Sequence, residues 1–200
     1  MFNKCFFTGT VPSIWTKGII NPIPKSSTGN SKDPLTYRGI TLVPVCYKLY
    51  CNVLNNRLVD WESDNNVLSD IQNGFRRGRS TIDHLSSLTT IVETRKLKRM
   101  STYVAFIDFR KAYDGINRTL LFQRLTDIGI RGHMFDALLS LYKNVECCVR
   151  INGCKTDWFK VNCGLKQGCF YHPYCLTFIL RILPHIFILW ILGLTFDKKK

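Results

Sequence analysis

The stretch TYVAFIDFRKAYD, residues 102–114, decides the fold class expected for this chain. Its first part, 102–109, is rich in β-branched and aromatic residues, which predicts a short buried strand. Asp108 lies near the end of that strand, where the sequence becomes polar. A carboxylate fixed at a strand end is a rigid ligand for a hard cation. The flanking segments mix helix, strand and hairpin signals without a regular alternation of strands and helices. The sequence therefore predicts an α+β fold.

Apolar residues recur at helical spacing on both sides of this stretch. Helices are expected over 47–60, after an N-cap at Ser80 or Thr81, over 117–127 and over 133–143. The helix over 117–127 is expected to end at Gly129. The first two of these helices are expected to be amphipathic.

Extended structure is expected in two further places. Pro22 and Pro24 exclude a helix over 17–25, and the polar residues 26–34 then form a loop. Later in the chain, Asn152-Gly153 separates two strand-like runs, CCVRI and CKTDWFKV, and predicts a β-hairpin.

Length and charge limit the classes of function. The 200 residues, 23.2 kDa in mass, suffice for one domain or two small ones with a real core. The net charge is +14, and the cationic excess is spread over both halves of the chain. Such a surface favours a polyanionic partner, either a nucleic acid or an anionic membrane face. Charge alone does not choose between these two partners.

The cysteines indicate a compartment. There are nine, with no C-x-x-C pair, and the N-terminus does not begin like a secretory signal. We therefore expect reduced thiols and an intracellular protein. Zinc is an alternative for the cluster Cys163, Cys169, His172 and Cys175, but their spacing fits no common zinc motif. Buried free cysteines are the favoured interpretation.

Short motifs recur along the chain in a recognisable order. They are Lys25 with YRGI (37–40), QNGFRRGRST (72–81), FIDFRKAYD (106–114) and GLKQGC (164–169). In this order and approximate spacing they resemble the reverse transcriptases, and most closely the polymerase of non-LTR retrotransposons of the long interspersed element type. The resemblance covers residues 9–185, nearly the whole chain.

That resemblance implies a right-hand polymerase fold, with fingers over residues 9–100, part of a palm over 101–185 and a divergent tail over 186–200. The implied activity is RNA-directed DNA synthesis, a metal-dependent nucleotidyl transfer. The implied partners are an RNA template, a DNA primer and a dNTP, with no obligatory protein partner. The implied cofactor is a pair of Mg²⁺ or Mn²⁺ ions.

The resemblance also assigns the metal and sugar contacts. Asp108 is then the catalytic residue that binds both ions, and the backbone carbonyl of Phe109 helps to hold one of them. Tyr113 lies under the sugar of the incoming nucleotide, where its ring would clash with a 2′-hydroxyl. The alternative for Tyr113 is an amphipathic core tyrosine. Asp114 is expected to cap the following turn rather than to bind metal.

Phosphate, base-pair and template contacts are implied at other motifs. Lys25 and Arg38 match positions that contact the triphosphate, and Gln167 and Gly168 match positions beside the nascent base pair. The template contacts are Gln72, Phe75, Arg76, Arg77 and Arg79. A solvated charge run is the alternative for RRGR. The chain departs from the family at Gly39, which is usually proline, and at His172, which is usually serine.

One family motif is missing. No aromatic-Ala-Asp-Asp sequence occurs in these 200 residues, and Asp197, the only late carboxylate, is a poor substitute. We therefore expect a domain truncated before its metal-binding hairpin, which is inactive by itself. A non-catalytic nucleic-acid-binding remnant and a group II intron maturase fragment are alternatives.

A basic membrane-associated protein is a further alternative. The apolar run over 174–196 is long enough to span a membrane. Arg181, Pro184 and His185 interrupt it, which disfavours a span. A palm helix followed by a divergent end is the favoured interpretation of this run.

Overall fold

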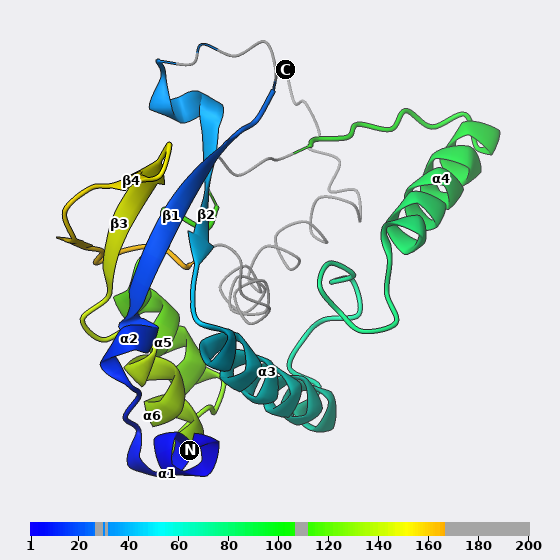
Figure 1. The fold of residues 1–200 in the computed structure, drawn as a ribbon. Helices are drawn as coiled ribbons and strands as arrows, with labels where there is room; N and C mark the ends of the chain where they lie inside the picture. Colours follow the sequence, from blue (N-terminus) through cyan, green and yellow to red (C-terminus); the bar gives the residue numbers. More distant parts are fainter. Residues whose placement is uncertain (27–29, 31, 107–111, 167–200) are drawn as a thin grey trace, which may run out of the picture.

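The computed structural model describes residues 1–26, 30, 32–106 and 112–166. In this part of the chain a single mixed sheet stands on a cluster of helices (Figure 1). The predicted α+β class is confirmed at this level. The predicted strand end with Asp108 and the apolar run over 174–196 both lie outside the described residues.

The sheet is five-stranded, in the order β2-β1-β3-β4, with β5 also paired to β3. The strands are β1 (Lys17–Pro24), β2 (Tyr37–Leu42), β3 (Glu146–Ile151), β4 (Cys154–Lys155) and β5 (Phe159–Lys160). β1 pairs antiparallel with β2 and parallel with β3. The segment between β1 and β2 includes the short 3-10 helix η1 (Pro34–Thr36), which Asp33 caps.

The two prolines of β1 lie where they do not interrupt the sheet. β1 pairs with β3 only as far as Ile20, so beyond that residue β2 is its one neighbour among the described strands. Pro22 and Pro24 follow this point, and a missing N–H is tolerated where one edge of a strand is open. The predicted extended segment over 17–25 is confirmed.

The core lies among the helices at one end of the sheet (Figure 1). These helices are α1 (Phe2–Thr8), α2 (Ser13–Thr16), α3 (Val45–Asn65), α5 (Arg118–Asp127) and α6 (Gly132–Ser140). Among the largest fully buried side chains are Tyr47, Tyr50, Leu54 and Leu58 of α3 and Leu121, Leu125 and Leu138 of α5 and α6. Burying each leucine stabilises the fold by roughly 1.5–3 kcal/mol. The expected helices over 47–60, 117–127 and 133–143 are thus present, with boundaries shifted by a few residues.

α4 (Thr81–Leu97) forms as predicted but packs differently from α3. It begins after Ser80, whose backbone N–H and hydroxyl both lie within hydrogen-bond distance of the Asp83 carboxylate. None of its described side chains is buried, and Ile82 and Leu85 are 72% and 62% exposed. Figure 1 shows α4 standing apart from the sheet.

The predicted strand over 102–109 is wrong for its described part. Residues 102–106 have no regular structure, and Tyr103 and Phe106 are 84% and 86% exposed. A strand is stable only when a neighbour takes up its backbone N–H and C=O groups. None of the described strands pairs with this segment, so its β-forming sequence has no strand partner within the described residues.

The predicted hairpin is confirmed, but its second strand is divided. Asn152 and Gly153 have φ of 50° and 85°, as a tight hairpin turn requires. The Thr156 hydroxyl, rather than a backbone carbonyl, accepts the Val149 N–H at 3.0 Å. The returning chain therefore pairs with β3 as two short strands, β4 and β5.

Among the described helices, none is both long enough and apolar enough to cross a membrane.

Candidate functional site

Two motifs that are far apart in the sequence meet in the structure. The Leu165 N–H donates to the Tyr113 carbonyl and the Gly164 N–H donates to the Ile116 carbonyl, each at 2.8 Å. Gly164 has φ of 76°, and a Cβ there would lie 2.7 Å from the Asp114 carbonyl oxygen. Only glycine permits this approach. The GLKQGC motif is thus fixed directly against the end of the FIDFRKAYD motif.

Arg118 holds this junction together. Its guanidinium donates to three carbonyls of the approaching segment, those of Val161 at 2.5 Å, Cys163 at 3.1 Å and Gly164 at 2.9 Å. The guanidinium carbon lies 5.1 Å from the centre of the Tyr142 ring. Burial lowers the pKa of Arg118, but a guanidinium titrates so far above neutrality that it stays charged.

Sequence reasoning missed Arg118, although one signal was available. Arg118 is the first residue of α5, immediately after its N-cap Asn117. A cation is unfavourable at a helix N-terminus because the helix dipole is positive there. A lone arginine in that position therefore indicates a partner outside the helix.

Lys166 fixes the other end of the junction. The side chain is buried, its ammonium donates to the Trp15 carbonyl at 2.9 Å, and it lies 4.8 Å from the centre of the Tyr47 ring. A buried ammonium needs such partners because it has lost its hydration. Lys166 was also missed, since a lysine within a short motif on a basic chain is expected at the surface.

Tyr113 lies at this junction, half-buried against the core. Burial raises the pKa of its hydroxyl. The predicted contacts Asp108, Phe109, Gln167 and Gly168 lie outside the described residues. Within the described ranges, no group of three or more His, Cys, Asp or Glu side chains could hold a metal ion.

Lys25 and Arg38 lie close together at the far end of the β1–β2 ladder. Arg38 is opposite Ile23, and the Lys25 N–H continues the ladder by donating to the Thr36 carbonyl at 2.9 Å. Because side chains two apart in a strand share a face, both cations belong to the same face. The Lys25 ammonium donates to the Leu35 carbonyl at 2.9 Å.

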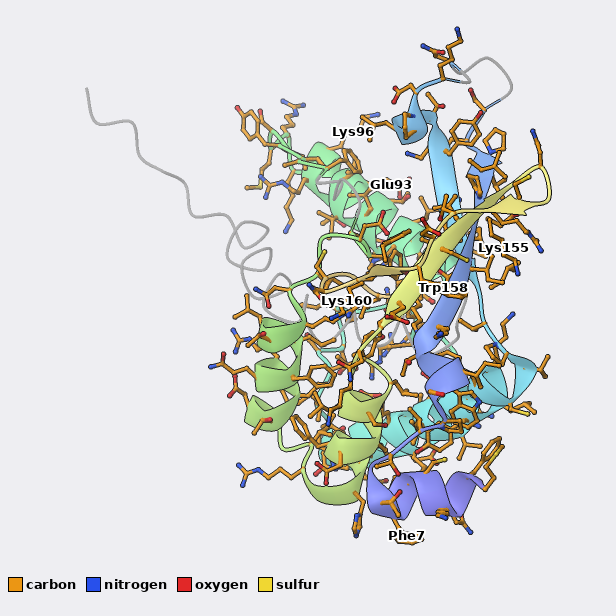
Figure 2. The ribbon with its side chains drawn as sticks, turned by 60° about the vertical axis from the view of Figure 1, so that its left-hand side comes forward. Phe7, Glu93, Lys96, Lys155, Trp158 and Lys160 are labelled. Carbon is orange, nitrogen blue, oxygen red and sulfur yellow. The ribbon has the colours of Figure 1, made fainter. Side chains whose placement is uncertain are left out.

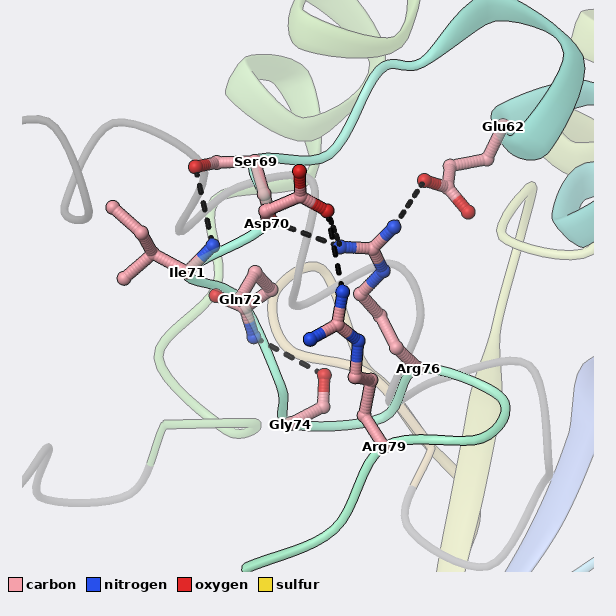
Figure 3. Close-up of polar contacts among 8 residues, drawn as sticks. All are labelled: Glu62, Ser69, Asp70, Ile71, Gln72, Gly74, Arg76 and Arg79. Atoms are coloured by element: carbon pink, nitrogen blue, oxygen red, sulfur yellow. Dashed lines mark hydrogen bonds and ion pairs between the residues drawn. The ribbon is translucent and has the colours of Figure 1, made fainter. Parts of the chain in front are cut away.

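The predicted template residues of the loop over 69–79 fall into two groups: arginines that contact carboxylates of the protein, and residues that stay exposed. Arg76 donates to the Ser69 carbonyl at 3.0 Å and lies 3.8 Å from the Glu62 carboxylate of α3 and 3.6 Å from that of Asp70 (Figure 3). Arg79 also contacts Asp70, at 3.3 Å. Arg76 thus holds the loop on α3, and the contact of Arg79 with Asp70 lies within the loop itself.

The remaining members of this loop differ in exposure. The Gln72 amide donates to the Gly74 carbonyl at 3.1 Å (Figure 3). Arg77 is exposed, with no hydrogen bond or ion pair to any described residue. Phe75 is 55% exposed and has φ of 62°, a left-handed conformation that is uncommon for an aromatic residue. The structure thus leaves Arg77 and Phe75 available to a partner.

Comparison with known proteins covers most of the chain. Residues 23–189 match the family of reverse transcriptases (RNA-dependent DNA polymerases). The chain is 21% identical over 168 residues to the Pol polyprotein of the type-1 retrotransposable element R2 of Nasonia vitripennis, which covers 84% of this chain and 16% of that protein.

Two relatives from Drosophila melanogaster agree with this match. A probable RNA-directed DNA polymerase from transposon X-element is 25% identical over 178 residues, 88% of this chain and 19% of the relative. A putative 115 kDa protein of the type-1 retrotransposable element R1DM is 29% identical over 188 residues, 92% of this chain and 17% of the relative. The chain thus spans less than a quarter of the length of these proteins. Because the family matches over most of its residues, the chain belongs to the reverse transcriptases, and its relatives are those of non-LTR retrotransposons.

Proposed function

We propose that this chain binds the template and the incoming nucleotide in an RNA-directed DNA polymerase of a non-LTR retrotransposon. In this assignment residues 9–100 belong to the fingers and residues 101–185 to the palm. One observation supports it most: Leu165 and Gly164 are hydrogen-bonded to Tyr113 and Ile116, which brings the two motifs of the nucleotide site together.

Different parts of the chain supply the separate contacts in this proposal. Lys25 and Arg38, on one face of the β1–β2 ladder, bind the triphosphate of the dNTP, because their charges suit phosphate oxygens. Arg77 and Phe75 contact the template, by charge and by stacking. Tyr113 lies beside the sugar. The substrates are an RNA template, a primer and a dNTP.

A divalent cation completes the proposed site. Asp108 and the Phe109 carbonyl would hold Mg²⁺ or Mn²⁺, since a carboxylate and a carbonyl are the hard oxygen donors that such ions prefer. When bound, the ion would stabilise the negative charge of the transferred phosphoryl group. Two ions need more carboxylates than Asp108 provides. Because these 200 residues hold no aromatic-Ala-Asp-Asp sequence, we expect no primer extension from them alone.

We further propose a reducing, intracellular location. The described cysteines are all free, and Cys5, Cys51, Cys147 and Cys148 are buried. Burial raises the pKa of the Cys147 thiol, which keeps it protonated and unreactive.

The proposal is tested by nucleotide-dependent binding. The 200-residue chain is titrated into a fluorescent RNA–DNA primer–template with Mg²⁺, with and without the complementary dNTP, and anisotropy is recorded. We expect the dNTP to tighten binding in the wild type. In Arg38→Gln this gain should disappear while binding of the primer–template alone persists.

The matched control is Lys32→Gln, an exposed cation in the loop that precedes Arg38. It should retain the gain from the dNTP. A wild type that binds no primer–template contradicts the proposal, and so does an Arg38→Gln variant that behaves like Lys32→Gln. Primer extension in the same samples should give no product, and extension would contradict the expected inactivity.

A further inference from the structure

We propose that the β3–β4–β5 hairpin carries a second nucleic-acid surface, which binds a single strand. This hairpin surface consists of Lys17, Arg150, Lys155, Trp158 and Lys160. It lies outside the predicted template loop and outside the predicted nucleotide contacts. The inference goes beyond the proposed function, because that function assigns no ligand to the hairpin.

The strand register brings these residues onto one face of the sheet. Lys17 is paired with Glu146, Glu146 with Lys160, and Arg150 with Lys155. Paired residues point to the same side, and positions 146 and 150 share a face because they are an even number apart. The Lys17 ammonium lies 5.0 Å from the centre of the Trp158 ring, which places Trp158 on that face too.

The charges on this face are poorly balanced within the protein. Lys17 has a long ion pair with Glu146, at 3.8 Å, in which the two side chains are 45% and 36% exposed. Arg150, Lys155 and Lys160 have no ion pair with a described residue. Arg150 and Lys155 are moreover directly opposite each other across the ladder. Like charges in that position destabilise a hairpin, and a bound polyanion would relieve the repulsion.

Trp158 gives the face a stacking element. Its side chain is 45% exposed, and it lies between the two short strands that carry Lys155 and Lys160 (Figure 2). An exposed indole among cations suits an unpaired base, since bases stack on aromatic rings while lysines neutralise the phosphates. In a duplex the base faces are already stacked on one another. The combination of Trp158 with these cations therefore favours a single strand over a duplex.

The hairpin surface also continues toward the predicted nucleotide contacts. Arg38 is paired with Ile23, which has the same parity along β1 as Lys17. Arg38 therefore lies on the same face of the sheet, with β1 between it and the hairpin. A strand bound at the hairpin could thus run across the sheet toward the site where we place the dNTP.

Tryptophan fluorescence and salt dependence test the proposal together. The 200-residue chain is titrated with a short unstructured RNA and, separately, with the same sequence as a duplex. Trp158→Phe identifies the part of any quenching that comes from the hairpin, because the other three tryptophans, Trp15, Trp61 and Trp190, remain in that variant. We expect the single strand to quench Trp158 and the duplex to leave it largely unchanged.

A charge-neutralised variant provides the second readout. Arg150→Gln, Lys155→Gln and Lys160→Gln combined should lower single-strand affinity about ten-fold. They should also reduce the slope of log K against log salt by about 2, since each lost phosphate contact contributes about 0.7. The thermal midpoint should stay the same or rise, because the Arg150–Lys155 repulsion is removed.

The matched control removes as much charge elsewhere. Lys96→Gln, Lys98→Gln and Arg99→Gln combined change exposed cations at and just after the C-terminal end of α4. Equal loss of affinity in the two triple variants overturns the hairpin proposal, and so does binding without any change in Trp158 fluorescence. In both outcomes the proposed function survives, because the chain still binds RNA. A wild type that binds no nucleic acid overturns both.

Discussion

The junction at Arg118 and the loop at Arg76 and Arg79 use arginine in different ways. Arg118 donates to three backbone carbonyls and is half-buried. Arg76 and Arg79 pair mainly with carboxylates, and their shared partner Asp70 is 90% exposed. Hydrogen bonds from a partly buried cation to neutral carbonyls are little affected by salt, whereas ion pairs to an exposed carboxylate such as Asp70 are screened. We infer that the Arg118 junction is a rigid part of the fold and that the loop over 69–79 is displaced at a lower free-energy cost.

The largest effect is expected from Arg118→Gln. It should lower the free energy of unfolding by about 3 kcal/mol, because three carbonyls lose a charged donor. Urea unfolding followed by circular dichroism measures the change. Arg118→Lys keeps the charge but has an ammonium in place of the forked guanidinium. Its free energy of unfolding should lie between those of the wild type and Arg118→Gln. A loss below about 1 kcal/mol for Arg118→Gln would show that the junction holds without it.

A smaller effect is expected from Arg76→Ala. It removes the hydrogen bond to Ser69 and two ion pairs, one of them to the nearly buried Glu62, and should cost about 1–2 kcal/mol. The comparison predicts that part of this loss disappears in 1 M salt, where the Debye length is about 3 Å. The Arg118→Gln loss should not change. Equal salt dependence in the two variants would contradict the distinction between junction and loop.

Arg77→Ala and Arg79→Ala separate binding from stability within the loop. Both should leave the free energy of unfolding within about 0.5 kcal/mol of the wild type, because both side chains are exposed. Arg77→Ala should weaken RNA binding and reduce the salt slope by about 0.7, as the loss of one phosphate contact requires. Anisotropy with labelled RNA measures this. Equal losses of RNA affinity in Arg77→Ala and Arg79→Ala would instead indicate that Arg79 leaves Asp70 and binds RNA.

The smallest effect concerns α4, which follows the loop. Hydrogen bonds from the Ser80 backbone N–H and then its hydroxyl lower the pKa of Asp83. The carboxylate form therefore stabilises the first turn of α4 above the ordinary pKa of aspartate, and this contribution is lost as pH falls through the lowered value. An NMR titration of the Ser80 amide should show this transition below the usual range. Asp83→Asn should abolish it, and an unshifted midpoint would contradict the contact.

Local signals predicted most of the elements, because their causes lie within a few residues. Asn152-Gly153 predicted a turn that needs positive φ, and of the two expected N-caps, Ser80 or Thr81, Ser80 is the one that precedes α4. The strand predicted over 102–109 was wrong for its described part, because strand formation depends on a neighbour, which no pattern within the segment reveals. The sequence also did not show that α3 is packed in the core and that α4 is exposed, because both helices have apolar residues at helical spacing.

The candidate site was predicted as a set of motifs but not as a structure. The motifs identified Tyr113 and Gly164, yet the bonds that join them depend on contacts between distant segments. Arg118 and Lys166, which hold the junction, were missed because a cation is ordinarily assigned to the surface. Arg76 and Arg79 were predicted, like Arg77, to contact the template. Their partners Glu62 and Asp70 could not be identified from the spacing of the sequence.

The bond between Lys166 and Trp15 joins residues 151 positions apart, and β1 near the N-terminus pairs with β3. During synthesis, α2 and β1 must therefore wait until almost all of the described chain has left the ribosome before these contacts close. Chains dominated by such distant pairings fold slowly and expose apolar surface meanwhile. Slower elongation before β3 would extend the interval in which β1 lacks this partner.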